Sequence, residues 1–113
     1  MHEMSLCEGV LQILESEAGK QGFNRVKAVW LEIGELSSVE PEAMLFSFDA
    51  VTRDSLADGA TLNIIRVPGQ AWCMQCSKSV NVKQRFDACP DCGSYQLQVT
   101  GGDEMKIKEL EVE

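Results

Sequence analysis

Four of the five cysteines in this chain of 113 residues occur as two Cys-x-x-Cys pairs, Cys73 with Cys76 and Cys89 with Cys92. Two intervening residues let both thiolates of a pair turn toward one ion. Two such pairs supply four sulfurs in a tetrahedron, which is the geometry that Zn²⁺ prefers. Gly93 follows the second pair and permits a tight turn under the metal. Because four protein ligands leave no open position for water or substrate, we expect a structural zinc site.

Other uses of the cysteines are less favoured. Disulfides are rare in the cytoplasm, where we expect this chain, and a redox-active Cys-x-x-Cys needs only one pair in thioredoxin-like surroundings. Iron in the same four sulfurs stays an alternative, since tetrahedral sulfur sites suit zinc or iron. The fifth cysteine, Cys7, lies near apolar positions and is expected to be a small buried residue. A ligand or redox role for Cys7 is the alternative.

The N-terminus offers a second candidate metal site, at the only histidine, His2. The initiator methionine is normally removed only when the next residue is small, so Met1 is expected to remain with a free α-amine. That amine, the His2 imidazole and the backbone nitrogen between them can close fused chelate rings. Deprotonation of the His2 or Glu3 amide makes the set all-nitrogen and nearly planar, with the Glu3 carboxylate nearby. Planar nitrogen sets select Ni(II) or Cu(II); the alternative is a histidine that stands there by accident.

Composition and charge exclude several classes of protein. Acidic residues outnumber basic ones by 18 to 10, which gives a net charge of −8, whereas nucleic-acid binding needs a basic surface. No apolar run approaches the roughly 20 residues of a membrane helix, and the N-terminus lacks the pattern of a secretory signal. We therefore expect a cytoplasmic protein that binds neither nucleic acid nor membrane. No enzyme is expected, because the chain has a single histidine and no phosphate-binding glycine-rich loop.

Hydrophobic periodicity predicts an α+β fold in which two helices pack on a small mixed three-stranded sheet. Ser5 and Glu8 have the spacing of a capping box that would start the first helix, and Pro41 suits the first position of the second helix. Apolar runs and alternations predict strands on either side. The elements are expected as helices from 5 to between 19 and 22 and from 41 to about 54, and as strands over 25–33, 60–67 and 104–112.

The cysteine segment is expected to be a zinc-ribbon-like module inserted into this body. Two strands alone would be marginal, so the strand beyond the cysteines is needed to complete the sheet. We therefore expect residues 1–69 and 102–113 to form the α/β domain and residues 70–101 to form the zinc-binding module. Few large side chains are available for the module's core, so the metal must supply much of its folding free energy. These core candidates are Trp72, Val80, Val82, Phe86, Tyr95, Leu97 and Val99.

Several motifs together are typical of one family. They are Met-His-Glu at 1–3, Ser-Leu-Cys at 5–7, Val-Trp-Leu-Glu-Ile-Gly at 29–34, the paired cysteines, and Glu-Leu-Glu-Val-Glu at 109–113. With these motifs the chain resembles the HypA/HybF family of hydrogenase nickel-incorporation proteins over essentially its whole length. The resemblance implies a nickel metallochaperone with a nickel-binding α/β domain and a zinc domain. It implies Ni(II) as transferred cargo and Zn²⁺ as a structural ion.

The resemblance also implies site residues and partners. It places nickel on His2 and on the backbone nitrogens of Met1, His2 and Glu3, and it matches Glu40 to an acidic residue that lies at the nickel site in some members. It assigns zinc to the four paired cysteines, Cys73, Cys76, Cys89 and Cys92. The implied partners are the nickel-binding GTPase HypB, the large-subunit precursor of [NiFe] hydrogenase and, in some bacteria, urease maturation proteins. Histidines that flank the cysteines in some members are absent from this chain.

Nickel transfer by ligand exchange is the mechanism that we expect. A site at the chain terminus can present Ni(II) to a partner that replaces its ligands one at a time. The main alternative is a zinc-ribbon adaptor that binds another protein and has no nickel role. An electron-transfer protein with iron in the four sulfurs is a further alternative.

Overall fold

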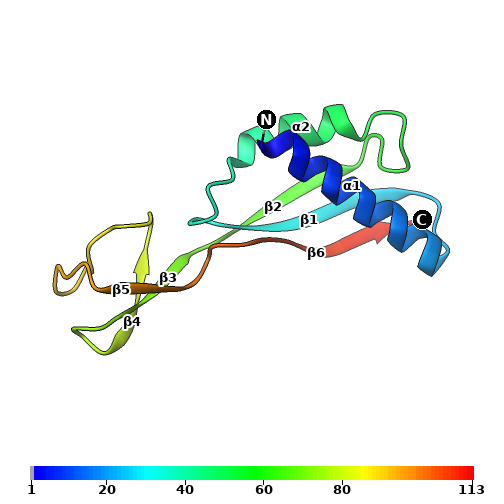
Figure 1. The fold of residues 1–113 in the computed structure, drawn as a ribbon. Coiled ribbons are helices and arrows are strands. Elements are labelled where there is room, and N and C mark those ends of the chain that lie inside the picture. The colour runs from blue at the N-terminus through cyan, green and yellow to red at the C-terminus, as the bar shows by residue number, and fades with distance from the viewer. Residues whose placement is uncertain (1) are drawn as a thin grey trace. The chain divides into compact units, whose positions relative to one another are not determined.

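The computed structural model describes residues 2–113, which divide into two compact units. The first unit comprises residues 2–31, 39–65 and 106–113, and the second comprises 32–38 and 66–105. In chain order the elements are α1 (His2–Gln21), β1 (Val26–Gly34), α2 (Pro41–Val51), β2 (Thr61–Val67), β3 (Gly69–Cys73), β4 (Lys78–Val82), β5 (Leu97–Gly101) and β6 (Met105–Val112), as labelled in Figure 1.

Strands β2, β1 and β6 form a three-stranded sheet in that order. Hydrogen bonds from Val26 N to Leu56 O and from Glu35 N to Val67 O, both 2.9 Å, flank β1 and show that β2 runs parallel to it. On the other side of β1, Gly34 N donates to Glu104 O at the end of β1, and Glu113 N donates to Arg25 O at its start. β6 is therefore antiparallel to β1, and the sheet is mixed. The parallel pair needs a crossover, which α2 supplies.

Both helices lie against one face of this sheet (Figure 1). Apolar side chains from α1, β1 and α2 are buried together in the first unit because the helices cover a strand that is apolar on both of its faces. Proline stands at the start of α2, as predicted, because its fixed φ suits a helix and its missing N–H has no partner to lose there. The buried residues include Cys7, Val10, Leu14, Val29, Leu31, Met44 and Phe48.

The predicted start of the first helix is wrong. α1 begins at His2, so Ser5 lies inside the first turn and does not cap the helix. An acidic residue in that turn, Glu3, offsets the positive end of the helix dipole. The carboxylate of Glu3 also accepts the backbone N–H of Glu40, from far along the chain, at 3.3 Å. These interactions stabilise helical structure three residues earlier than the Ser5–Glu8 pattern indicates.

The second unit contains an antiparallel sheet of order β4-β3-β5. Its small core combines Leu36 with Ala71, Val80 and Val82, and two cysteines complete it, Cys73 and Cys89. The aromatic residues predicted for this core are not in it. Phe86 and Tyr95 are largely exposed, and Trp72 is partly exposed because it alternates with the inward-facing Ala71 and Cys73 along β3.

Two glycines allow the backbone of the second unit to pack unusually closely. A Cβ on Gly34 would overlap the carbonyl oxygen of Gly102, and a Cβ on Gly102 would overlap the carbonyl oxygen of Pro68. Gly102 also has φ +76°, a conformation that L side chains rarely adopt. The backbone N–H of Leu36 donates to Gly102 O at 2.8 Å, which fixes this approach. Glycine at position 102 is therefore required on two separate grounds.

The fold class predicted from the sequence is confirmed: an α+β arrangement with two helices on a mixed three-stranded sheet, and a further three-stranded unit that carries the cysteines. In residues 2–113, no helix is long and apolar enough to cross a membrane.

Candidate metal sites

The two Cys-x-x-Cys pairs converge on one point in the second unit. All four Sγ atoms lie within 4.8 Å of one another. The separation is 3.6 Å between Cys73 and Cys92 and 3.9 Å between Cys76 and Cys89. A zinc ion with Zn–S bonds of about 2.3 Å in a tetrahedron requires sulfurs about 3.8 Å apart. The cluster therefore has the donor set and the size that a Zn²⁺ ion needs.

The same backbone turn presents each pair of cysteines. Ser77 N donates to Cys73 O in the first turn and Gly93 N donates to Cys89 O in the second, both at 2.8 Å. The residue after each second cysteine has positive φ, 53° at Ser77 and 77° at Gly93. Glycine takes this conformation without strain, as the sequence indicated for Gly93, whereas Ser77 was not singled out. Its place after a Cys-x-x-Cys pair, matching that of Gly93, is the signal that could have found it.

Hydrogen bonds to sulfur favour thiolates over thiols at part of this cluster. Burial has the largest single effect and raises the pKa of the Cys89 thiol. Hydrogen bonds from the backbone N–H groups of Cys92 and Asp91 and with the Cys73 and Cys92 side chains together outweigh burial and lower this pKa to about 7. The pKa of Cys76 rises to about 12, first because of its hydrogen bond with Cys92 and then because of burial. Cys76 therefore keeps a proton that a metal ion would displace on binding.

A cation stands beside the cluster. The ammonium group of Lys78 forms an ion pair with Asp91, which raises the pKa of Lys78, and the charges of Cys76 and Cys89 raise it further. Four thiolates around one Zn²⁺ carry a net charge of about −2. Lys78 offsets part of that charge without being a ligand.

His2 and Glu3 form the N-terminal candidate site at the start of α1. The His2 side chain is exposed, and its Nδ1 atom lies 3.6 Å from Oε2 of Glu3. Backbone N–H groups of Glu3 itself and of Glu40 lower the pKa of the Glu3 carboxyl group, with a smaller contribution from His2. Met1, whose amine was expected to be a ligand, lies outside the described residues.

Glu40 comes close to this site through its backbone. It is the N-cap residue of α2, and its N–H donates to the Glu3 carboxylate. Its own side chain makes no capping hydrogen bond and is exposed. The residues that the sequence linked to nickel, His2, Glu3 and Glu40, are thus brought together where the two helices begin.

Cys7 lies in α1 and is completely buried. Its thiol lies 3.6 Å from the carbonyl oxygen of Met44 and 3.9 Å from the Met44 sulfur. Burial, and then the charge of Glu3, raise the pKa of Cys7 to about 11. A protonated, buried thiol suits a packing role, as expected, and neither a ligand nor a redox role.

Comparisons with known proteins identify relatives of this chain along its whole length. Residues 1–112 match the family model described as "Hydrogenase/urease nickel incorporation, metallochaperone, hypA". The hydrogenase maturation factor HypA of Alkalilimnicola ehrlichii is 66% identical over 113 residues, which cover all of both chains. The protein of the same name from Azotobacter chroococcum is 63% identical, again over all of both chains.

Two solved structures share the fold. The solution structure of the Ni metallochaperone HypA from Helicobacter pylori superposes with a TM-score of 0.68 at 24% identity, covering 97% of this chain and 96% of that one. A second solution structure, of a HypA protein, superposes with a TM-score of 0.71 at 26% identity and covers 99% of this chain and 96% of the other. The resemblance found in the sequence motifs is confirmed by these matches and by the family model.

Proposed function

Because this chain belongs to the HypA family of hydrogenase and urease nickel-incorporation metallochaperones, we propose that it binds Ni(II) at its N-terminus and delivers it for maturation of [NiFe] hydrogenase. The observation that carries this proposal is the position of His2 and Glu3 at the very start of α1. There an imidazole, a carboxylate and backbone nitrogens lie within a single helical turn.

The chemistry of the first turn suits a planar nitrogen site. The N–H groups at the start of a helix have no carbonyl partner within it, so the nitrogens of His2 and Glu3 can become ligands without breaking the helical ladder. The amine of Met1, the amide of His2 and the Nδ1 atom of His2 would form fused five- and six-membered rings. The negative charges of two deprotonated amides would balance the 2+ charge of the nickel ion. The positive end of the helix dipole would then not repel the bound metal.

Glu3 would take part in two ways. Its backbone nitrogen is a proposed ligand, and its carboxylate lies 3.6 Å from the imidazole nitrogen that would turn toward the metal. We assign the Glu40 side chain a position beside the site and no bond to nickel, because only its backbone contacts Glu3.

The resident metal in this proposal is zinc, held by Cys73, Cys76, Cys89 and Cys92. The separations between the sulfurs fit a tetrahedral four-thiolate site, which has no position open for a substrate. Zinc would therefore hold the second unit together, and nickel would be the cargo.

Delivery would proceed by exchange of ligands with a partner in the cytoplasm. A site made from the chain terminus is open on one side, so incoming ligands can replace its own stepwise. The nickel-binding GTPase HypB and the precursor of the hydrogenase large subunit are the proposed partners, with urease maturation proteins in organisms that make urease.

A nickel titration of untagged, zinc-loaded protein tests the N-terminal site. We expect about one Ni(II) per chain with the visible absorption of a planar nitrogen complex, and His2→Ala should weaken binding by at least about tenfold because one chelate ring is lost. A chain extended by Gly-Ser before Met1 should also lose the planar spectrum, since its terminal amine is displaced. Glu40→Gln, which leaves the proposed nitrogen ligands intact, is the matched control and should bind as the wild type does.

Equal binding by the wild type and His2→Ala would exclude this site, and so would an absence of binding by both. The zinc-ribbon adaptor would then be the better description, and its protein partner would be sought by affinity capture on the zinc-loaded chain. If His2→Ala delivered nickel to the hydrogenase precursor as fast as the wild type, the transfer mechanism would be wrong.

A further inference from the structure

The four paired cysteines differ in how far solvent reaches them. Cys73 is fully buried and Cys89 is 3% exposed, and both belong to the core of the second unit. Cys76 is partly buried, whereas Cys92 is exposed. Cys92 also has exposed residues on both sides of it, Asp91 and Gly93. A reagent that approaches the cluster from solvent therefore meets Cys92 first.

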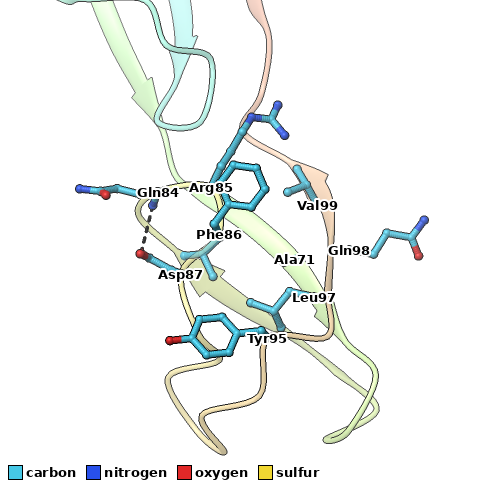
Figure 2. A pocket seen from close by; sticks show the side chains of 10 residues that line it. Ala71, Gln84, Arg85, Phe86, Asp87, Tyr95, Leu97, Gln98 and Val99 are labelled. Atoms are coloured by element: carbon cyan, nitrogen blue, oxygen red, sulfur yellow. Dashed lines mark hydrogen bonds between the residues drawn. The ribbon is translucent and has the colours of Figure 1, made fainter.

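The neighbouring pocket gives no second route to the buried sulfur of Cys73. This pocket of about 360 Å³ is lined by Phe86, Tyr95 and Leu97, among others (Figure 2). Leu97 lies opposite Cys73 in the antiparallel pairing of β3 and β5, on the same face of the sheet. None of the described residues that line the pocket is a cysteine, however, and Cys73 is completely buried. We therefore expect Cys73 to react after a neighbouring sulfur, and not before it.

The exposed Cys92 has the buried Cys73 as its neighbour, and their sulfur atoms lie 3.6 Å apart. The sulfur atoms of Cys76 and Cys89 are farther apart, at 3.9 Å. Cys73 is the last residue of β3, and its carbonyl oxygen accepts the N–H of Ser77 at 2.8 Å, so its position is fixed. An exposed cysteine beside a second cysteine that can close a disulfide is the arrangement of redox-sensitive sites.

A cation distinguishes the other two sulfurs of the cluster. The ammonium group of Lys78 forms an ion pair with Asp91, and the charges of Cys76 and Cys89 also act on it. A cation beside a thiolate makes that thiolate a weaker nucleophile. Bound zinc holds all four sulfurs as thiolates, so their exposure and this cation, rather than protonation, set their order of reaction. Both favour the side of the cluster at Cys92.

We propose that Cys92 is a modification site, at which the zinc-loaded chain reacts first with electrophiles, and that a hydroperoxide converts it to a disulfide with Cys73. The Cys92 thiolate takes the terminal oxygen of the hydroperoxide. The O–O bond breaks, and the alkoxide or hydroxide that leaves is protonated by water. The Cys73 thiolate then attacks the sulfur of the Cys92 sulfenic acid, forms the S–S bond and displaces hydroxide. Two electrons pass from the two sulfurs to the peroxide.

The disulfide removes two of the four zinc ligands, so zinc is released from the remaining pair, Cys76 and Cys89. A reductant reverses the bond, and added zinc then rebinds. Transient disulfides of this kind do form in reducing compartments. The proposal rests on the zinc site proposed above, and nickel binding plays no part in it.

Limited alkylation of the untagged, zinc-loaded wild-type chain tests which sulfur reacts first. The wild type is used because replacement of any paired cysteine would itself remove a zinc ligand. The zinc content is measured beforehand, substoichiometric N-ethylmaleimide is added, and chains that carry a single label are fragmented in the mass spectrometer. We expect Cys92 to carry at least about five times as much label as Cys73, Cys76 or Cys89.

Treatment of the same protein with H₂O₂ tests the second step. We expect the disulfide between Cys73 and Cys92 to be at least about threefold more abundant than any other pairing of the four, with about one zinc ion released for each such bond. A phosphine reductant and added zinc should restore both the mass and the zinc content of the chain. Cys7→Ala is the matched control and should give the same products, because the fifth thiol is completely buried.

Three outcomes would overturn the proposal and leave the zinc site intact. The first is equal labelling of the four sulfurs, or a first label at a cysteine other than Cys92. The second is a main disulfide other than the one between Cys73 and Cys92, and the third is full retention of zinc by chains that carry that bond. A chain that binds no zinc would overturn the zinc site and this proposal together.

Discussion

Burial suppresses the thiol chemistry of Cys7. It is fully buried beside Met44, and its pKa is raised to about 11. We expect iodoacetamide at pH 8 to alkylate Cys7 about a hundredfold more slowly in the folded protein than in urea, because the thiolate is the reactive form and it is scarce and inaccessible here. Mass-spectrometric quantification of the peptide that contains Cys7 provides the measurement. Equal rates in the two states would show that the thiol is open to solvent.

Cys7 also makes the free energy of unfolding decrease at high pH. The ordinary pKa of the thiol is 9.0, so between pH 9 and 11 the unfolded chain loses a proton that the folded chain keeps. The free energy of unfolding therefore decreases as pH rises through this range and is unaffected by Cys7 below it. Cys7→Ala should flatten this part of the pH profile.

The connection between β5 and β6 depends on the absence of a side chain at Gly102. We expect Gly102→Ala to cost about 3 kcal/mol in the free energy of unfolding, because it combines a strained φ with an overlap against the Pro68 carbonyl group. Gly59→Ala is the matched control, since Gly59 has φ +78° but open space around its Cβ position, and it should cost about 1 kcal/mol. Urea unfolding of both variants would measure the difference. Equal losses would mean that the backbone at Pro68 moves aside without cost.

The position of a strand or helix could be predicted where the local sequence pattern determines it. A boundary set by a contact between residues far apart in the chain could not be predicted. The strand over 25–33 and the start of α2 at Pro41 follow from apolar alternation and proline geometry, and the structure has both. The start of α1 depends on the contact between Glu3 and Glu40, and no periodic pattern reveals a contact across 37 positions.

The same limit applies within the two candidate sites. Spacing alone is enough to predict that the four paired cysteines converge, because each pair closes its own turn. Spacing does not tell an aromatic residue in a core from one beside an open pocket. Phe86 and Tyr95 were therefore predicted as core residues and are exposed.

At the scale of the whole molecule, removal of zinc should affect one unit and spare the other. Two of the six buried core residues of the second unit, Cys73 and Cys89, are proposed zinc ligands, so its core is incomplete without the metal. We expect chelation to abolish amide protection in β3, β4 and β5 while α1 and α2 keep theirs. Hydrogen exchange followed by mass spectrometry can measure both at once.

A pair of cysteine variants controls this experiment. Cys76→Ser should reproduce the effect of chelation, and Cys7→Ala should retain zinc and full protection. Loss of protection in α1 on chelation would show that the two units unfold as one. Full protection of β3–β5 without zinc would show that the core suffices alone.

The matching turns at Cys73–Ser77 and Cys89–Gly93 also bear on how the protein is made. Each is closed by a hydrogen bond over five residues, and loops of that size close within about 100 ns. A ribosome adding roughly 5–20 residues per second needs about one to three seconds to pass from Cys76 to Cys92. During that interval the nascent chain displays a finished half-site with only two sulfurs. A metal ion that arrived during synthesis would therefore meet the first pair of cysteines alone, and the second pair would complete the site.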